Sequence, residues 1–222
     1  MSGDAGDRAA GVAMLRQGCY RLLSRGFARP GADDRDGLLQ AGVILDSLEL
    51  DSFAFAPVIW RWLDRLAVVD WDALGREYVR LFDSAADGAM CGPAESQHLG
   101  SLLAGDAGAI AARLDAALRR YGGGADDERP PDHVGWQLEL GARMSQREWM
   151  LRERGDDAAS AAVLSDLHNL AVDLQRWLPG LQRGLSRHDR TGVFRSLGEA
   201  AMAFVTHEAD LLGGVLRTEA AR

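Results

Sequence analysis

The chain has 222 residues, 47% hydrophobic and 26% charged, enough for one large domain or two small ones with a true core. Its 33 acidic and 25 basic residues give a formal net charge of −8, and every basic residue is arginine. The lack of lysine excludes Schiff-base chemistry and a P-loop, and the acidic balance favours a basic partner over nucleic acid.

The cysteines and the apolar segments bear on the cellular compartment. Cys19 and Cys91 form no CxxC pair, which excludes a disulfide scaffold and a cysteine-based zinc module. The first ten residues are small and acidic, and no window reaches about 18 uninterrupted apolar residues. We therefore expect a cytoplasmic protein without a membrane span, in a reducing compartment.

The first third of the chain has helical periodicity. Apolar residues recur at steps near 3.6 from Val12 to Phe27 and predict an amphipathic helix, which the Arg29-Pro30-Gly31 segment ends. Further helices are predicted over 35–48, 57–68 and 71–82. Asp70 is the predicted N-cap of the last of these helices.

Two segments interrupt this pattern. Residues 83–94 carry two glycines and a proline and are predicted to form a long loop, a kind of segment that is often functional. Residues 122–131 hold three consecutive glycines and two prolines, which predicts a hinge. The hinge would separate an N-terminal helical part, 1–121, from a C-terminal helical part, 132–222, within what we expect to be one domain overall.

The remaining segments are also predicted to be helical. They are residues 95–103, 106–121, 132–154, 157–174, 176–186 and 191–216, with Asp132 as the N-cap of the third. No segment alternates with the period of two that is typical of strands. The sequence therefore predicts an all-α protein, a single globular bundle of about ten helices.

Catalytic motifs are weak. Glu95 and His98 have the Glu-x-x-His spacing of di-iron bundles, but such sites need a second pair, and none of the other histidines follows a glutamate at that spacing. No Gly-x-Ser-x-Gly elbow occurs, and the run 122–124 follows a helix and lacks a lysine. We expect no catalysis, no metal and no resident cofactor.

Two helix faces place a titratable residue next to apolar ones. Trp136, Leu140 and Met144 share a face that we expect to pack inward, and His133, one turn earlier, is either a core residue or a functional one. Glu208 falls within the apolar stripe of the last helix. Because a buried carboxylate is costly unless it is paired, we expect Glu208 to have a salt-bridge partner or a basic ligand.

Three blocks in order carry a resemblance to a known family. They are Glu77-Tyr78-Val79-Arg80-Leu81-Phe82, Gly92-Pro93-Ala94-Glu95-Ser96, and Pro131-Asp132-His133-Val134 with Glu139-Leu140 in the same helix. Their order and spacing resemble the TorD/DmsD family of cytoplasmic chaperones for molybdenum enzymes. The family pattern is Glu-Tyr-x-x-Leu-Phe, then Pro-Tyr-Glu-Ser, then Asp-His-x-x-x-Glu-Leu, and the resemblance covers residues 71–181.

The resemblance implies an all-helical binding protein and no enzymatic activity. Its partners would be the twin-arginine leader and the apo catalytic subunit of a molybdenum oxidoreductase. The chaperone would hold this subunit in the cytoplasm until the molybdopterin cofactor is inserted. It would act as a monomer, or as a dimer that exchanges parts at the hinge.

The resemblance also implies which residues bind the client. The matching positions are Glu77, Tyr78, Leu81, Phe82, Pro93, Glu95, Ser96, Asp132, His133 and Glu139. Among these, we expect Glu95, Asp132 and Glu139 to bind the leader arginines, because hydrogen bonds to charged groups are strong and directional. Phe82, together with Trp136, would form an apolar wall.

The chain departs from the family pattern at two positions. Ala94 stands where a tyrosine is usual, which removes an aromatic side chain from the loop, and Asp173 stands where a histidine is common. The run 78–83 also resembles the nitrate reductase assembly chaperones, whose client carries no standard leader. Two alternatives stay open: a helical enzyme that uses a nucleotide or a metal, and a generic helical adaptor without a leader-peptide client.

Overall fold

The computed structural model describes residues 3–31, 34–83, 90–99, 107–124 and 129–220, and these segments contain helices and no strands. The α-helices are α1 (Gly3–Gly26), α2 (Asp34–Ser47), α3 (Ala56–Val68), α4 (Trp71–Tyr78), α5 (Ser96–Leu99), α6 (Ala107–Arg120), α7 (Val134–Glu153), α8 (Asp157–His188) and α9 (Val193–Ala220). A 3-10 turn, η1 (Leu50–Ser52), and a π-helical turn, η2 (Val79–Asp83), complete them. The predicted all-α class is confirmed.

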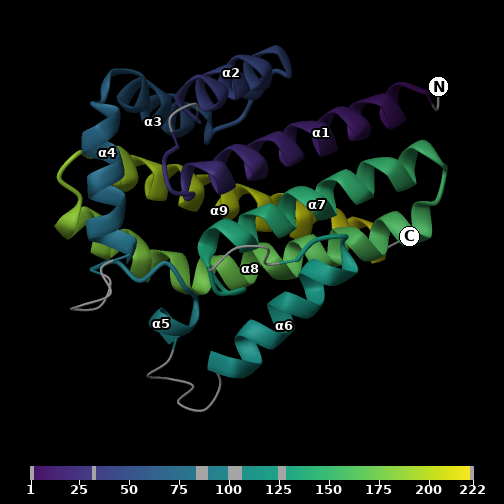
Figure 1. The fold of residues 1–222 in the computed structure, drawn as a ribbon. Helices are drawn as coiled ribbons and strands as arrows, with labels where there is room; N and C mark the ends of the chain where they lie inside the picture. Colours follow the sequence, from purple (N-terminus) through teal and green to yellow (C-terminus); the bar gives the residue numbers. More distant parts are fainter. Residues whose placement is uncertain (1–2, 32–33, 84–89, 100–106, 125–128, 221–222) are drawn as a thin grey trace.

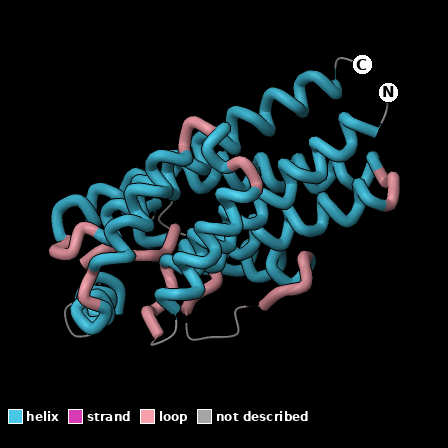
Figure 2. Tube along the Cα trace, turned by 90° about the horizontal axis from the view of Figure 1, so that it is seen from above, coloured by secondary structure: helices cyan, strands magenta, loops and turns pink. Residues whose placement is uncertain are grey.

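Four long helices form the centre of the molecule. α1 packs along α7, α7 along α8 and α8 along α9, while α3 covers α9 and α2 lies between α1 and α3. Figure 1 shows α4 at one end of this bundle and the shorter α5 and α6 beside α8. The two chain ends lie at the same end of the bundle in both views (Figures 1 and 2).

The packing of α1 against α7 is close. A Cβ atom at Gly141 of α7 would lie 2.5 Å from Cε1 of Tyr20 of α1, so only glycine lets the two helices approach this far. The Tyr20 ring in turn meets the Phe204 ring of α9 edge to face, with a centroid distance of 4.7 Å. Such aromatic contacts stabilise the core beyond the area that they bury.

Glu208 has the salt-bridge partner that its place in an apolar stripe required. Arg16 of α1 donates from Nε to Glu208 Oε2 of α9 over 2.5 Å, and from Nη1 to Glu148 of α7. The side chains of Arg16, Glu148 and Glu208 are each at most 4% exposed. Burial raises the pKa of Glu208, and the neighbouring guanidinium of Arg16 opposes that rise.

Several helix ends agree with the sequence. α1 ends before the Arg29-Pro30-Gly31 segment, and α3 begins with Pro57 in its first turn, where a missing N–H costs nothing. Asp70 caps α4, because its Oδ1 accepts a hydrogen bond of 2.8 Å from the N–H of Ala73.

One predicted break is wrong. Residues 157–174 and 176–186 do not form separate helices but belong to the continuous helix α8, with Pro179 inside it. The buried side chains of α8 continue through this point, with Leu174, Trp177 and Leu181 each at most 1% exposed. Burial of these side chains outweighs the backbone hydrogen bond that the proline removes.

A predicted cap is also wrong. Asp132 is not the N-cap of α7; that position is taken by His133, whose Nδ1 accepts a hydrogen bond of 3.0 Å from the N–H of Gly135. The carboxylate of Asp132 instead accepts from the N–H of Ser96, at the first turn of α5, over 3.0 Å. A contact between segments 36 residues apart thus replaces the expected local cap.

Parts of four predicted segments lie outside the described residues. These parts are residues 84–89 of the predicted loop, 100–103 of the helix predicted over 95–103, residue 106 of the helix predicted over 106–121, and 125–128 of the predicted hinge. None of the described helices is both long enough and apolar enough to cross a membrane.

Candidate functional site

An open cleft of about 710 Å³ lies where the end of α1, the turn η2 and the start of α7 come together. Its lining residues are Ala28, Arg29, Tyr78, Phe82, Asp83, Pro93, Arg129, Pro130 and His133. Tyr78, Phe82, Pro93 and His133 are among the predicted client-binding residues, and they come from all three sequence blocks. The cleft is therefore where the three blocks meet.

Aromatic rings form the apolar side of the cleft. The rings of Tyr78 and Phe82 lie 5.0 Å apart between centroids, and Phe82 meets Phe194 of α9 edge to face at 5.3 Å. Leu81, between them in sequence, is fully buried in the core. The π-helical turn η2 carries Phe82, and such turns occur frequently at functional sites.

Backbone hydrogen bonds join the second block to the third. Ala94 and His133 form an isolated antiparallel bridge, and the N–H of Val134 donates to the carbonyl of Pro93 over 2.8 Å. The N–H of Glu95 donates to the carbonyl of Asp132 over 3.0 Å. These bonds fix Pro93 and His133 side by side at the cleft.

Glu77 does not line the cleft but ties the first block to the turn between α8 and α9. Its carboxylate accepts from Arg80 Nη2 over 2.6 Å and from the backbone N–H of Arg190 over 2.7 Å. Burial acts to raise the pKa of Glu77, but the hydrogen bonds from Arg80 and Arg190 outweigh it, so the pKa lies below its ordinary value.

Glu95 is buried behind the cleft. It is 3% exposed, and its carboxylate accepts from Arg113 Nη2 of α6 over 3.2 Å and from Gln137 Nε2 of α7 over 3.1 Å. Burial raises the pKa of Glu95, and the charge of Arg113 acts against that rise. Asp173, the residue that departs from the family pattern, binds the same guanidinium at Nη1 over 2.9 Å.

The other predicted residues also have partners within the fold. Asp132 and Ser96 bind each other, and Glu139 pairs with Arg143 one turn later over 2.9 Å. The guanidinium of Arg129 stacks over the ring of Trp136 at 4.8 Å from its centroid. Trp136, like Leu140 and Met144 on the same face, is at most 9% exposed, so the predicted inward packing of these three residues is correct.

The charged rim of the cleft was not predicted from the sequence. Asp83, Arg29 and Arg129 line it, and the side chains of Asp83 and Arg29 are exposed. Asp83 directly follows the first block, so adjacency could have suggested it. No sequence signal places Arg29, three residues after the end of α1, against Phe82 and Asp83, more than 50 positions later.

The Glu-x-x-His pair does not form a metal site in this structure. His98 Nε2 hydrogen-bonds with the carbonyl of Gly92 over 2.6 Å, and its ring stacks on Trp177 at a centroid distance of 5.6 Å. Glu95 points to Arg113. Among the described residues, no group of three or more His, Cys, Asp or Glu side chains could hold a metal ion.

Comparisons with known proteins give a family and a fold. The model of the nitrate reductase delta subunit family matches residues 45–182, more than half of the chain and a range that includes every predicted client-binding residue. A crystal structure from Archaeoglobus fulgidus, of a candidate redox enzyme maturation protein, superposes with a TM-score of 0.53 at 18% identity. This match covers 86% of the present chain and 93% of the other. A search among curated proteins found no match.

Proposed function

The chain belongs to the nitrate reductase delta subunit family, and on that premise we propose that it is a maturation chaperone for a molybdenum oxidoreductase. The three sequence blocks resemble those of the leader-binding chaperones, and from them we infer that it binds the apo catalytic subunit through that subunit's twin-arginine leader. The family match alone does not imply this, because the client of the nitrate reductase assembly chaperones carries no standard leader. In the cytoplasm, it holds the subunit until the molybdenum cofactor is inserted, and then releases it. The protein acts by binding and does no covalent chemistry.

The observation that carries this proposal is the convergence of the three sequence blocks on one cleft within the family range. Tyr78 and Phe82 supply an apolar wall, and Asp83 supplies an exposed carboxylate at the rim. The apolar segment of a twin-arginine leader complements this wall, and Asp83 can accept from one of its two guanidinium groups, whereas Arg29 and Arg129 on the same rim disfavour a second cation there. Carboxylates bind guanidinium groups with strong, directional hydrogen bonds.

The expected binding free energies assign different roles to the apolar wall and to the carboxylate. Burying roughly 400 Å² of apolar leader surface stabilises the complex by about 10 kcal/mol before costs. Ordering the peptide and losing its translational freedom offset most of that gain. The apolar wall therefore supplies the affinity, and each carboxylate–arginine contact, at about 1.5–3 kcal/mol, fixes the register of the leader.

A peptide titration tests the proposal. A labelled leader peptide from a molybdenum oxidoreductase of the same organism is titrated with the full chain, beside a peptide in which both arginines are lysines. We expect measurable binding and a preference for the Arg-Arg peptide, because a guanidinium can form paired hydrogen bonds to a carboxylate and an ammonium cannot. Equal binding of both peptides would instead support a generic adaptor.

Variants locate the site. Asp83→Asn removes the carboxylate at the rim and is expected to weaken Arg-Arg peptide binding about tenfold, a typical loss for one charged hydrogen bond. Asp64→Asn is the matched control, because Asp64 is exposed on α3 and does not line the cleft. If the two variants bind the peptide equally well, the cleft is not the leader site.

A further inference from the structure

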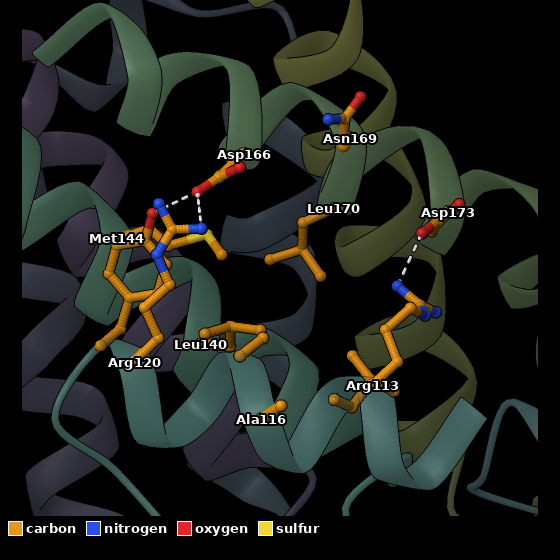
Figure 3. A pocket seen from close by; sticks show the side chains of 12 residues that line it. Arg113, Ala116, Arg120, Leu140, Met144, Asp166, Asn169, Leu170 and Asp173 are labelled. Atoms are coloured by element: carbon orange, nitrogen blue, oxygen red, sulfur yellow. Dashed lines mark hydrogen bonds and ion pairs between the residues drawn. The ribbon is translucent and has the colours of Figure 1, made fainter. Parts of the chain in front are cut away.

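A second cavity lies between α6 and α8, with α7 as its floor. Its volume is about 310 Å³, and Figure 3 shows Leu140 and Leu170 inside it. Arginine–aspartate pairs close both ends: Arg113 with Asp173 at 2.9 Å, and Arg120 with Asp166 at 3.1 Å (Figure 3). α6 therefore spans this cavity and does not pack closely against α8.

α6 makes few contacts with the rest of the fold. Of its fourteen described residues, only Leu114 and Leu118 are buried. The side chains of Arg113 and Arg120 are 48% and 67% exposed, and ion pairs at such exposure contribute little stability. The attachment of the Arg113 end of α6 is therefore weak.

The acids that hold Arg113 form a site shaped for a guanidinium. Nη1 binds Asp173 over 2.9 Å, and Nη2 binds Glu95 over 3.2 Å, so two nitrogens of one planar group bridge two carboxylates from different elements. A single ammonium lacks this fork. Because Glu95 is 3% exposed, its charge needs a cation beside it.

The site also has an acceptor that Arg113 leaves unused. Gln137 is 1% exposed, and its Nε2 donates to Glu95 Oε2 and to the carbonyl of Asp132. Among the described residues, nothing donates to Gln137 Oε1, although this oxygen is buried. Leaving such a group unpaired is costly, and a further N–H of a deeper guanidinium could pair with it.

We propose that Glu95, Asp173 and Gln137 form a binding site for an arginine of the client, and that Arg113 of α6 occupies this site until the client displaces it. Arg113 is half-exposed, so its side chain is the part of this site that can withdraw into solvent. This inference rests on the proposed function, because it takes the arginine-bearing leader as the occupant. It adds a built-in competitor that lowers the affinity, while the two carboxylates select arginine over lysine.

Removing the competitor is the direct test. Arg113→Gln in the full chain is expected to tighten binding of the Arg-Arg leader peptide at least about three- to fivefold, the factor for one exposed ion pair, because the peptide no longer has to displace the contacts of Arg113 with Asp173 and Glu95. The Lys-Lys peptide should gain less. Arg119→Gln is the matched control, because Arg119 lies on the same helix and, among the described residues, forms its ion pair with Asp115 of that helix. Its affinity should equal that of the wild type.

A second measurement uses the wild type and does not depend on how a variant folds. Saturating Arg-Arg peptide should speed hydrogen–deuterium exchange in residues 107–120, since displacement of Arg113 loosens α6. Peptide that binds wild type but leaves both this exchange and the Arg113→Gln affinity unchanged would overturn the inference and leave the proposed function standing. Peptide that binds none of the proteins would overturn the proposed function itself.

Discussion

Arg16 lies between Glu148 and Glu208, where α1, α7 and α9 meet. The sequence allowed the prediction that Glu208 has a partner, because a carboxylate within an apolar stripe is costly. It could not identify Arg16, which is 192 residues away and belongs to an amphipathic helix like several others. The packing of the helices decides which charged residues pair across the bundle, and no local sequence pattern predicts this pairing.

Loss of Arg16 should strongly destabilise the protein. Arg16→Met leaves two buried carboxylates without their cation, and we expect the free energy of unfolding to fall by about 3–5 kcal/mol in urea titrations at pH 7.5. The loss should shrink as the pH is lowered, because the uncompensated carboxyls then take up protons. Arg21→Met, at an exposed position of the same helix, is the control. Equal stability of the two variants would contradict a pairing role for Arg16.

Glu77 should make stability depend on pH in the acid range. Its pKa is lower in the folded protein than in the unfolded chain, where glutamate titrates at about 4.3. Its stabilising contribution is therefore present above the unfolded pKa and is lost as the pH falls through the lower folded value.

The corresponding variant is Glu77→Gln, which keeps the shape and removes the charge. We expect it to cost about 1–2 kcal/mol at pH 7, the worth of hydrogen bonds from Arg80 and Arg190 to a charged acceptor. The difference from wild type should be constant above the unfolded pKa of about 4.3 and shrink as the pH falls through the lower pKa of the folded protein. Urea titrations over this range measure it, and a difference that is constant with pH would show that the charge of Glu77 is not responsible.

At the scale of elements, the long helices could be predicted and their connections could not. Periodicity located α1, α3 and α9, and the Gly/Pro-rich segment before α7 marked where that helix begins. The wrong break in α8 and the wrong cap of α7 share a cause. Tertiary contacts decide both: burial of Trp177 in one case, and the hydrogen bond from Ser96 to Asp132 in the other.

Pro179 allows a test of the explanation for the continuous helix α8. If packing holds α8 together despite the proline, Pro179→Ala should restore the hydrogen bond to the Gln175 carbonyl and stabilise the protein by about 1–2 kcal/mol. This corresponds to a rise in Tm of about 2–8 °C by calorimetry. Pro57→Ala is the control, since Pro57 sits in the first turn of α3, where proline is well accommodated. A Tm that falls for Pro179→Ala would contradict the account of α8.

At the scale of the whole molecule, the family resemblance identified several residues that line the cleft, but most of the carboxylates that it implied bind within the chain. Tyr78, Phe82, Pro93 and His133 line the cleft, whereas Glu77, Asp132 and Glu139 bind groups of the chain itself. Sequence blocks show which residues belong together, and only the packing shows which side chains face solvent. For the same reason, only the structure shows that Arg29 and Arg129 line the cleft.

Capture of the client from cells tests the central claim most directly. The tagged full chain is isolated from its source organism, under conditions in which a molybdenum oxidoreductase is expressed, and the bound proteins are identified by mass spectrometry. Maturation before cofactor insertion predicts one dominant partner, the catalytic subunit of that oxidoreductase, free of molybdenum cofactor. Recovery of no such subunit, or of the subunit already loaded with cofactor, would contradict the proposed function.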